Sequence, residues 1–209
     1  MSVLPPILVA SGNKKKLAEL ERRLVHLGVQ LVVPHAVGGI PDTIEDAPTF
    51  EGNAAKKARE AATAKGMWAL ADDSGLEVDA LQGAPGVLSA RFAGRHGDDA
   101  ANNALLLERL SNVPDGARNA RFVCVLALAR PDGSLALSVR GEARGRIAFA
   151  ARGTRDFGYD PLFVFDEPGH PQTGRGFAEL EPDDKDAVSH RGRALRELAR
   201  LLPEAIRSV

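Results

Sequence analysis

Three lysines follow a glycine near the N-terminus, in the run Ser11-Gly12-Asn13-Lys14-Lys15-Lys16. An apolar stretch precedes this run and a helical pattern follows it, so free backbone N–H groups are expected at the start of the helix. Such groups bind anions and the lysines add positive charge, which together predict a phosphate site. The alternative is a helix cap followed by solvated lysines, although the helix dipole disfavours cations in a first turn. The run lacks the spacing of a Walker loop.

Two adjacent carboxylates, Asp72 and Asp73, follow a predicted strand and precede Ser74. Neighbouring carboxylates repel each other unless a cation or a hydrogen-bond donor lies between them. Oxygen ligands suit magnesium, which binds one or two carboxylates together with water and substrate phosphates. The alternative is an ordinary Asp-Ser-Gly turn. Glu45, in the acidic loop at residues 38–48, is a candidate carboxylate from a separate segment, although acidic loop residues are more often only solvated.

A loop sequence with two aromatic residues, Phe157-Gly158-Tyr159-Asp160, precedes Pro161. Aromatic rings stack on a nucleobase and a carboxylate accepts its N–H groups, which predicts a base-binding loop. The alternative, in which both rings pack inward and anchor the loop, remains open.

Cations gather again at the start of the final predicted helix. Ser189 is expected to cap this helix, so that His190 and Arg191 lie in its first turn, shortly after Lys185. The helix dipole disfavours cations at this end unless they face the oxygens of a ligand.

The elements that position these clusters alternate between strands and helices in the first half of the chain. Strands are predicted at residues 7–10, 31–33 and 68–71, and helices at residues 49–65 and 98–110. A further helix follows the first strand, with Leu17, Leu20, Leu24 and Leu27 on one face; Ser11 or Asn13 can cap it and Gly28 can end it. A hairpin joins residues 121–129 to residues 135–139, and a long loop at residues 152–176 precedes the final helix. The predicted fold class is therefore α/β, with a mixed central sheet and flanking helices. Ligands of such sheets bind beyond the carboxyl ends of strands, where the first two clusters are expected.

Composition excludes several classes of protein. The chain has 209 residues, 44% hydrophobic and 26% charged, and its net charge of −1 argues against a general binder of nucleic acid backbone. Cys124 is the only cysteine, which excludes an internal disulfide and a Cys-based zinc site and predicts a buried structural thiol. The N-terminus lacks the pattern of a signal peptide and the apolar runs are too short to span a bilayer, so we expect a cytoplasmic protein.

Six blocks in order, covering nearly the whole chain, resemble the inosine/xanthosine triphosphate pyrophosphatase family. They are Ser11-Gly12-Asn13-x-x-Lys16, Thr49-Phe50-x-x-Asn53-Ala54-x-x-Lys57-Ala58, Ala71-Asp72-Asp73-Ser74-Gly75-Leu76, Gly86-x-x-Ser89-Ala90-Arg91, Phe157-Gly158-Tyr159-Asp160-Pro161 and Ser189-His190-Arg191-Gly192.

The resemblance implies a Maf/Ham-like α/β fold, a single domain at residues 1–209 with two lobes around an active-site cleft, usually in a homodimer. It implies a Mg²⁺-dependent enzyme, a nucleoside triphosphate pyrophosphohydrolase. Such an enzyme converts dITP, ITP and XTP to the monophosphate and pyrophosphate, and so keeps deaminated purines out of nucleic acid synthesis. The expected partner is this small-molecule substrate, with neither nucleic acid nor membrane.

The family's motifs also assign roles to individual residues. Glu45 and Asp73 are expected to hold the metal, and Asp73 is also the expected proton acceptor for the attacking water. The residues expected to bind substrate are Ser11, Gly12, Asn13, Lys14, Lys15, Lys16, Ser74, Phe157, Gly158, Tyr159, Asp160, Lys185, His190 and Arg191.

One departure from the family pattern leaves a question open. Many relatives carry Glu where this chain has Gly52, and Glu51 lies one place earlier. Two other functions are alternatives: a Maf-type pyrophosphatase for pyrimidine or modified nucleotides, and a nucleotide-binding sensor without catalysis. The blocks at residues 157–160 and 189–191 speak against the first, and the retained carboxylates speak against the second.

Overall fold

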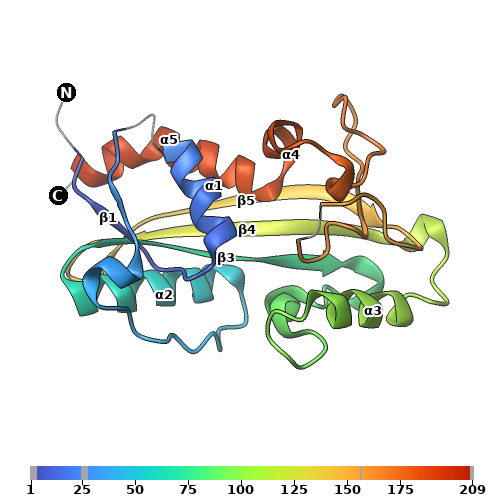
Figure 1. Ribbon diagram of the computed structural model, residues 1–209, viewed down its shortest axis with the longest axis horizontal. Coiled ribbons are helices and arrows are strands. Elements are labelled where there is room, and N and C mark those ends of the chain that lie inside the picture. Colours follow the sequence, from blue (N-terminus) through green and yellow to red (C-terminus); the bar gives the residue numbers. More distant parts are fainter. Residues whose placement is uncertain (1–3, 25–27, 156, 208–209) are drawn as a thin grey trace. The chain divides into compact units, whose positions relative to one another are not determined.

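The computed structural model describes residues 4–24, 28–155 and 157–207. Its strands form one six-stranded mixed sheet in the order β2-β1-β3-β4-β5-β6 (Figure 1). β1 pairs in parallel with β2 and β3, and β5 pairs antiparallel with β6. The strands are β1 (Ile7–Val9), β2 (Leu31–Val32), β3 (Trp68–Val78), β4 (Asn119–Ala129), β5 (Leu135–Ile147) and β6 (Phe163–Phe165). This arrangement confirms the predicted α/β fold with a mixed sheet.

The helices are α1 (Lys14–Leu24), α2 (Phe50–Lys65), α3 (Asp99–Arg109), α4 (Pro182–Val188) and α5 (His190–Arg207). Short 3-10 helices are η2 (Pro34–Val37), η3 (Asp79–Leu81), η4 (Gly86–Arg91), η5 (Asp115–Ala117) and η6 (Phe177–Glu179). No helix in the described part of the chain combines the length and the apolar character that crossing a bilayer requires.

The chain forms two compact units. Unit 1 comprises Met1–Asp73, Cys124–Arg140 and Ala194–Val209, and unit 2 comprises Ser74–Val123 and Gly141–Arg193. Three strands and α5 contribute residues to both units. In β3, the boundary falls at the peptide bond between Asp73 and Ser74.

In unit 1, α1 and α5 pack on one face of the sheet and α2 lies on the other (Figure 1). The core under α1 and α5 contains Ile7, Val9, Leu20, Leu24, Leu70, Cys124, Leu126, Leu195, Leu198 and Leu202. These leucines recur every three or four residues along both helices, so each helix turns one apolar face to the sheet. The other face is covered by alanines of α2, which allow a close approach: Ala54, Ala58, Ala61 and Ala62 are buried.

Unit 2 has its own core, in which aromatic rings pack together. Phe122 stacks parallel to Phe177 with ring centroids 5.7 Å apart, and Phe163 tilts against both at 4.7 Å. Arg118 is buried at the edge of this core, and its guanidinium donates to four backbone carbonyls, two of which are those of Leu110 and Ile147 at 2.8 Å. A buried guanidinium needs such acceptors, because an unpaired buried donor is costly. Arg118 thereby fixes the end of α3 against the end of β5.

Two sequence predictions about the elements are wrong. β3 does not stop at Ala71 but continues to Val78, so Asp72 and Asp73 lie inside the strand. The long loop at residues 152–176 contains β6. α4 precedes the final helix, in a segment for which the sequence predicts no element. Leu27, expected on the first helix, lies outside the described residues.

Candidate functional site

The lysine-rich run begins shortly after the end of β1. The N–H of Ala10, just after β1, donates to the carbonyl of Leu70 at 2.8 Å, which fixes the chain to β3. Ser11 Oγ accepts from the N–H of Asn13 at 3.2 Å, and Asn13 Oδ1 accepts from the N–H of Lys16 at 3.2 Å. The predicted cap is therefore present, and it is Asn13 that caps α1.

Lys16, at the third position of α1, reaches back to β3 and forms an ion pair with Asp72. The Asp72 side chain is only 3% exposed, and its second oxygen lies 3.7 Å from the thiol of Cys124. Cys124 is buried, as predicted. The structure gives backbone positions for Lys14 and Lys15, but their side chains are outside what it describes, so their phosphate contacts stay predictions.

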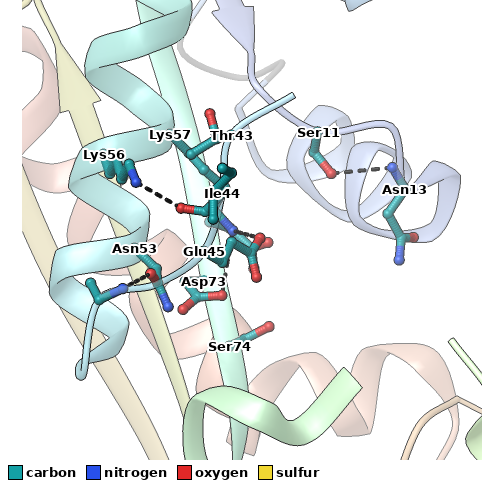
Figure 2. A network of polar contacts seen from close by, with 12 residues as sticks. Ser11, Asn13, Thr43, Ile44, Glu45, Asn53, Lys56, Lys57, Asp73 and Ser74 are labelled. Carbon is teal, nitrogen blue, oxygen red and sulfur yellow. Dashed lines mark hydrogen bonds and ion pairs between the residues drawn. The ribbon is translucent and has the colours of Figure 1, made fainter. Parts of the chain in front are cut away.

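A second lysine, Lys57, lies between two of the predicted site carboxylates (Figure 2). Its ammonium is 2.8 Å from Glu45 Oε1 and 3.4 Å from Asp73 Oδ1. Glu45 comes from the acidic loop, Lys57 from α2 and Asp73 from β3. The structure thus brings together the two residues that the sequence analysis expects to hold a metal, which are 28 positions apart in the chain.

The acidic loop is fixed by α2 at several points, which explains why Glu45 lies beside Asp73. Asn53 Oδ1 accepts from the N–H of Ala47 at 2.9 Å, and the Lys56 ammonium is 2.9 Å from the carbonyl of Ile44. Lys56 also pairs with Asp46 at 2.7 Å. These contacts are on both sides of Glu45, so the loop segment that carries its carboxylate is held in place (Figure 2).

The adjacent carboxylates Asp72 and Asp73 point to opposite faces of β3, because successive side chains alternate along a strand. Asp72 faces α1 and pairs with Lys16, whereas Asp73 faces α2 and pairs with Lys57. The sequence analysis expects one cation or one hydrogen-bond donor between the two carboxylates, but each of them has a lysine of its own. The reason is that β3 continues through this position, so the two side chains lie on opposite faces of the strand.

Burial is the main cause of the raised pKa of Asp73, and the charges of Glu45 and Asp72 add to it. Lys57 and Lys16 act in the opposite direction, but burial prevails. The pKa of Lys57 is also raised: burial alone would lower it, but the charges of Asp73, Asp72 and Glu45 together outweigh that effect. The acidic cluster therefore holds Lys57 in its charged form.

The cluster fits a magnesium ion that arrives with a phosphate substrate. Asp73 Oδ2 is buried and has no hydrogen-bond partner among the described residues, so one carboxylate oxygen is left for a ligand. Over the described residues, no group of three or more His, Cys, Asp or Glu side chains is arranged to hold a metal. Magnesium does not require such a group, because it commonly binds one or two carboxylates and completes its shell with water and phosphate.

In unit 2, the other predicted substrate-binding residues also converge. The Arg191 guanidinium donates to Ser74 Oγ at 3.0 Å and lies 5.8 Å from the ring centre of Phe157. Lys185 forms an ion pair with the buried Asp160, and its ammonium lies 5.6 Å from the same ring. Residues from β3, the loop at 157–160, α4 and α5 therefore form one polar cluster around a half-buried aromatic ring.

His190 and Ser189 have partly structural roles in this cluster. The imidazole of His190 stacks on Phe122, with ring centroids 4.7 Å apart. Ser189 Oγ accepts from the N–H of Gly192 at 3.0 Å, which confirms the predicted cap of the final helix. Both His190 and Arg191 lie in the first turn of α5, as expected.

Tyr159 packs inward. Its ring belongs to the core of unit 2, and its hydroxyl donates to the carbonyl of Ser89 at 2.9 Å. Ser89 is held in turn by the N–H of Leu76, which donates to its Oγ at 2.9 Å. Of the two aromatic rings that the sequence offers for stacking on a base, Phe157 is the one outside the core, and Tyr159 anchors the loop. Contact of Tyr159 with substrate stays a prediction.

The departure at Gly52 also has a local explanation. A Cβ atom at position 52 would lie 2.7 Å from the Cβ of Ala47, so a larger residue would require the acidic loop to shift. Glu51 pairs with Arg140 at 2.6 Å, on a partly exposed surface of unit 1. It therefore does not point to the Glu45 cluster in place of the missing glutamate.

Sequence reasoning gave Lys57 no role of its own. The available signal was its spacing: Asn53 and Lys57 are four residues apart and therefore lie on the same face of α2. Asn53 is buried, so a lysine on the same face is expected to have an acidic partner.

Comparisons with known proteins agree over nearly the whole chain. Residues 7–201 match the model of the Ham1 family. A dITP/XTP pyrophosphatase of Mycolicibacterium paratuberculosis is 53% identical over 98% of this chain and 99% of that protein. A protein of the same name from Rhodopirellula baltica is 47% identical over 97% of this chain and 94% of that protein.

Solved structures give the same result. A HAM1 protein from Coxiella burnetii is 42% identical, with a TM-score of 0.86 over 96% of this chain and 100% of the other. A structure from Mycobacterium abscessus, described as a nucleoside-triphosphatase or dITP/XTP pyrophosphatase, is 52% identical, with a TM-score of 0.77 over 95% of this chain and 99% of the other.

Proposed function

The chain belongs to the Ham1 family, and we propose that it hydrolyses the deaminated purine nucleoside triphosphates dITP, ITP and XTP to the monophosphate and pyrophosphate. Relatives that are 53% and 52% identical over nearly the full length are named dITP/XTP pyrophosphatase, which supports this activity. The observation that carries it in this chain is the pairing of Glu45 with Asp73 around Lys57, with one Asp73 oxygen left for a ligand.

The triphosphate is assigned to unit 1. Lys16 and the N–H groups of the loop at residues 11–13 supply positive charge for the leaving pyrophosphate. Lys57 holds the Glu45 and Asp73 carboxylates close to each other, where they would bind Mg²⁺. Bound magnesium neutralises charge that develops on the phosphates. Asp73, as the carboxylate with a buried oxygen left for a ligand, accepts the proton of the attacking water.

The base is assigned to unit 2. Phe157 offers a ring for stacking, and Arg191 offers donors for an oxo group at C6. Asp160 and Lys185, which pair with each other, together with His190, complete the expected set of contacts. Consecutive residues of β3 belong to the two proposed sites: Asp73 to the triphosphate site and Ser74 to the base site.

A product assay with a panel of nucleoside triphosphates tests the proposal. With Mg²⁺ present, ITP, dITP and XTP should give monophosphate and pyrophosphate much faster than ATP or GTP. Nucleoside diphosphate and orthophosphate as the main products would contradict cleavage between the α and β phosphates. Replacing Mg²⁺ with a chelator should abolish turnover, and adding it back should restore turnover.

Two further expectations belong to the proposal. A homodimer is tested by light scattering of the full chain at micromolar concentration. A cytoplasmic location, inferred from the sequence, is tested by fractionation of cells that produce the protein.

A further inference from the structure

We propose that Asp99 and Asn103 of α3 form a clamp on Gly158 that sets the position of the base-binding loop, and so contributes to base selectivity. The proposal rests on the proposed function for the role of that loop, but the clamp itself rests on contacts within unit 2. Neither residue belongs to the substrate-binding set predicted from the sequence.

Both polar groups of the Gly158 backbone are held by the same helix. The N–H of Gly158 donates to Asp99 Oδ2 at 2.8 Å, and its carbonyl accepts from Asn103 Nδ2 at 2.9 Å. Asp99 and Asn103 are four residues apart, so they lie one above the other on one face of α3. Two side chains at this spacing can therefore bind the N–H and the carbonyl of the same loop residue.

The clamp holds Gly158 in a conformation that most residues avoid. Its φ is +57°, in the left-handed region that favours glycine. This backbone angle determines the directions in which the two flanking side chains point. The Phe157 ring lies near the guanidinium of Arg191, whereas the Tyr159 ring packs in the core, where its hydroxyl donates to the carbonyl of Ser89. Loss of either clamp contact would let Phe157 move relative to Arg191.

Asn103 carries a cost that points to a specific role. Its Oδ1 is buried and has no hydrogen-bond partner among the described residues, so only the Nδ2 donor is used. A buried polar atom without a partner costs roughly 1–3 kcal/mol, a cost that an apolar residue at this position would avoid. Among the described residues, the contact with Gly158 is the hydrogen bond that this side chain makes.

Other contacts hold α3 in place, as a clamp requires. Asp98 Oδ1 caps the helix by accepting from the N–H of Ala101 at 3.1 Å. Next to the clamp, Asn102 Oδ1 accepts from the N–H of Ala93 at 2.8 Å. At the other end, Arg118 holds the carbonyl of Leu110. The helix that carries Asp99 and Asn103 is therefore fixed at both ends.

Two isosteric substitutions test the clamp through selectivity. Asn103→Asp replaces the donor with an acceptor, which then faces the Gly158 carbonyl. It should raise KM for ITP about ten-fold or more while kcat changes little, because binding of the base is lost equally in the ground and transition states. Turnover of ATP, whose base the loop does not select, should change little. Asp99→Asn keeps an acceptor for the Gly158 N–H and should retain nearly the wild-type ratio of ITP to ATP.

Ala104→Asp is the matched control, because it adds the same charge one residue further along on an exposed position of α3. It should leave KM for ITP and the ITP to ATP ratio unchanged. A merely structural role of Asn103 would lower kcat for both substrates together. Wild-type KM and selectivity in Asn103→Asp, or an equal loss of selectivity in Ala104→Asp, would overturn the proposed role of the clamp.

Hydrogen exchange measured by mass spectrometry provides a readout without activity. The Gly158 amide should exchange at least about ten-fold faster in Asp99→Ala than in the wild type, while the α2 amides keep their rates. Unchanged exchange at Gly158 would overturn the clamp itself. A wild-type enzyme that cut ITP no faster than ATP would instead contradict the proposed function, and the exchange result would still decide whether the clamp exists.

Discussion

Asp72 and Asp73 are neighbours in the chain, yet each pairs with a different lysine on a different face of the sheet. Asp72 pairs with Lys16 of α1, and Asp73 pairs with Lys57 of α2. The two carboxylates therefore have separate tasks: Asp72 holds the lysine proposed for phosphate, and Asp73 belongs to the proposed metal site. This division leads to the predictions that follow.

Asp73→Asn should lose about 10²–10⁴-fold in kcat while the fold survives, because the amide neither accepts a proton from water nor replaces a charged metal ligand. Steady-state assays with ITP, together with circular dichroism, measure both properties. Asp115→Asn is the control, since this exposed carboxylate pairs with Arg146 at 2.9 Å in unit 2, outside the proposed metal site. Turnover close to that of the wild type in folded Asp73→Asn would refute the assignment.

Lys57→Met should lower the free energy of unfolding in the presence of a chelator by about 1–3 kcal/mol, between the values for exposed and buried pairs, because removing the shared partner of two partly buried ion pairs leaves Glu45 and Asp73 facing each other. Mg²⁺ should restore more stability to this variant than to the wild type, since it replaces the missing charge. Thermal unfolding with chelator and with Mg²⁺ measures the difference.

The control for this experiment is Arg200→Met on α5, whose guanidinium pairs with Glu197 on the exposed surface, away from the Glu45 loop. Exposed pairs contribute about 0–1 kcal/mol, so this variant should show the wild-type response to Mg²⁺. Equal responses of the two variants would mean that Lys57 does not lie at a metal site.

The raised pKa of Asp73 predicts how Mg²⁺ binding and stability depend on pH. Asp73 must be ionised to bind Mg²⁺, so the affinity of the free protein for Mg²⁺ should have an acid limb, falling on acidification through a pKa above 3.8, the ordinary value. In Lys57→Met this acid limb should move to higher pH, because the Lys57 charge lowers the pKa of Asp73.

Stability should change in the opposite direction. A carboxyl group whose pKa is raised by folding binds its proton more tightly in the folded state. Its contribution to stability is therefore present below pH 3.8 and is lost as the pH rises through the folded pKa. Unfolding curves of the metal-free wild type and of Asp73→Asn, recorded across this window, isolate that contribution. Parallel curves for the two proteins would contradict the shift.

Arg191→Ala should lower kcat/KM for ITP much more than for ATP. Hypoxanthine presents an acceptor at O6, which suits a guanidinium donor, whereas adenine presents an amino donor there. Each buried unpaired group costs roughly 1–3 kcal/mol, so loss of the Arg191 side chain should lower the ratio of kcat/KM for ITP to kcat/KM for ATP by about ten-fold or more. An unchanged ratio would remove Arg191 from base recognition, whatever the effect on the overall rate.

Local signals were sufficient for much of the fold. Thr49 caps α2 by accepting from the N–H of Gly52, and Gly66 ends this helix with a φ of +61°, close to the predicted bounds. Asn13, one of the two candidate caps of the first helix, and Ser189, the predicted cap of the last, both cap their helices, because capping depends only on residues up to three positions away.

The errors arise where distant contacts decide the backbone. Asp72, Asp73, Ser74 and Gly75 have the composition of a turn, but sheet pairing with neighbouring strands keeps this segment extended. The position of Lys57 between Glu45 and Asp73 depends on the contacts between the acidic loop and α2, which no local pattern encodes. The inward packing of Tyr159 depends on a carbonyl 70 residues away.

The contact between Cys124 and Asp72 gives this chain an internal reporter. Cys124 is the only thiol in the sequence and has no exposed surface, so a thiol-modifying reagent reaches it only after β4 separates from the elements that cover it. The modification rate therefore measures how often the core beneath Lys16 opens under native conditions. No labelling site has to be engineered for this measurement, and the single modified residue lies directly against the carboxylate that holds Lys16.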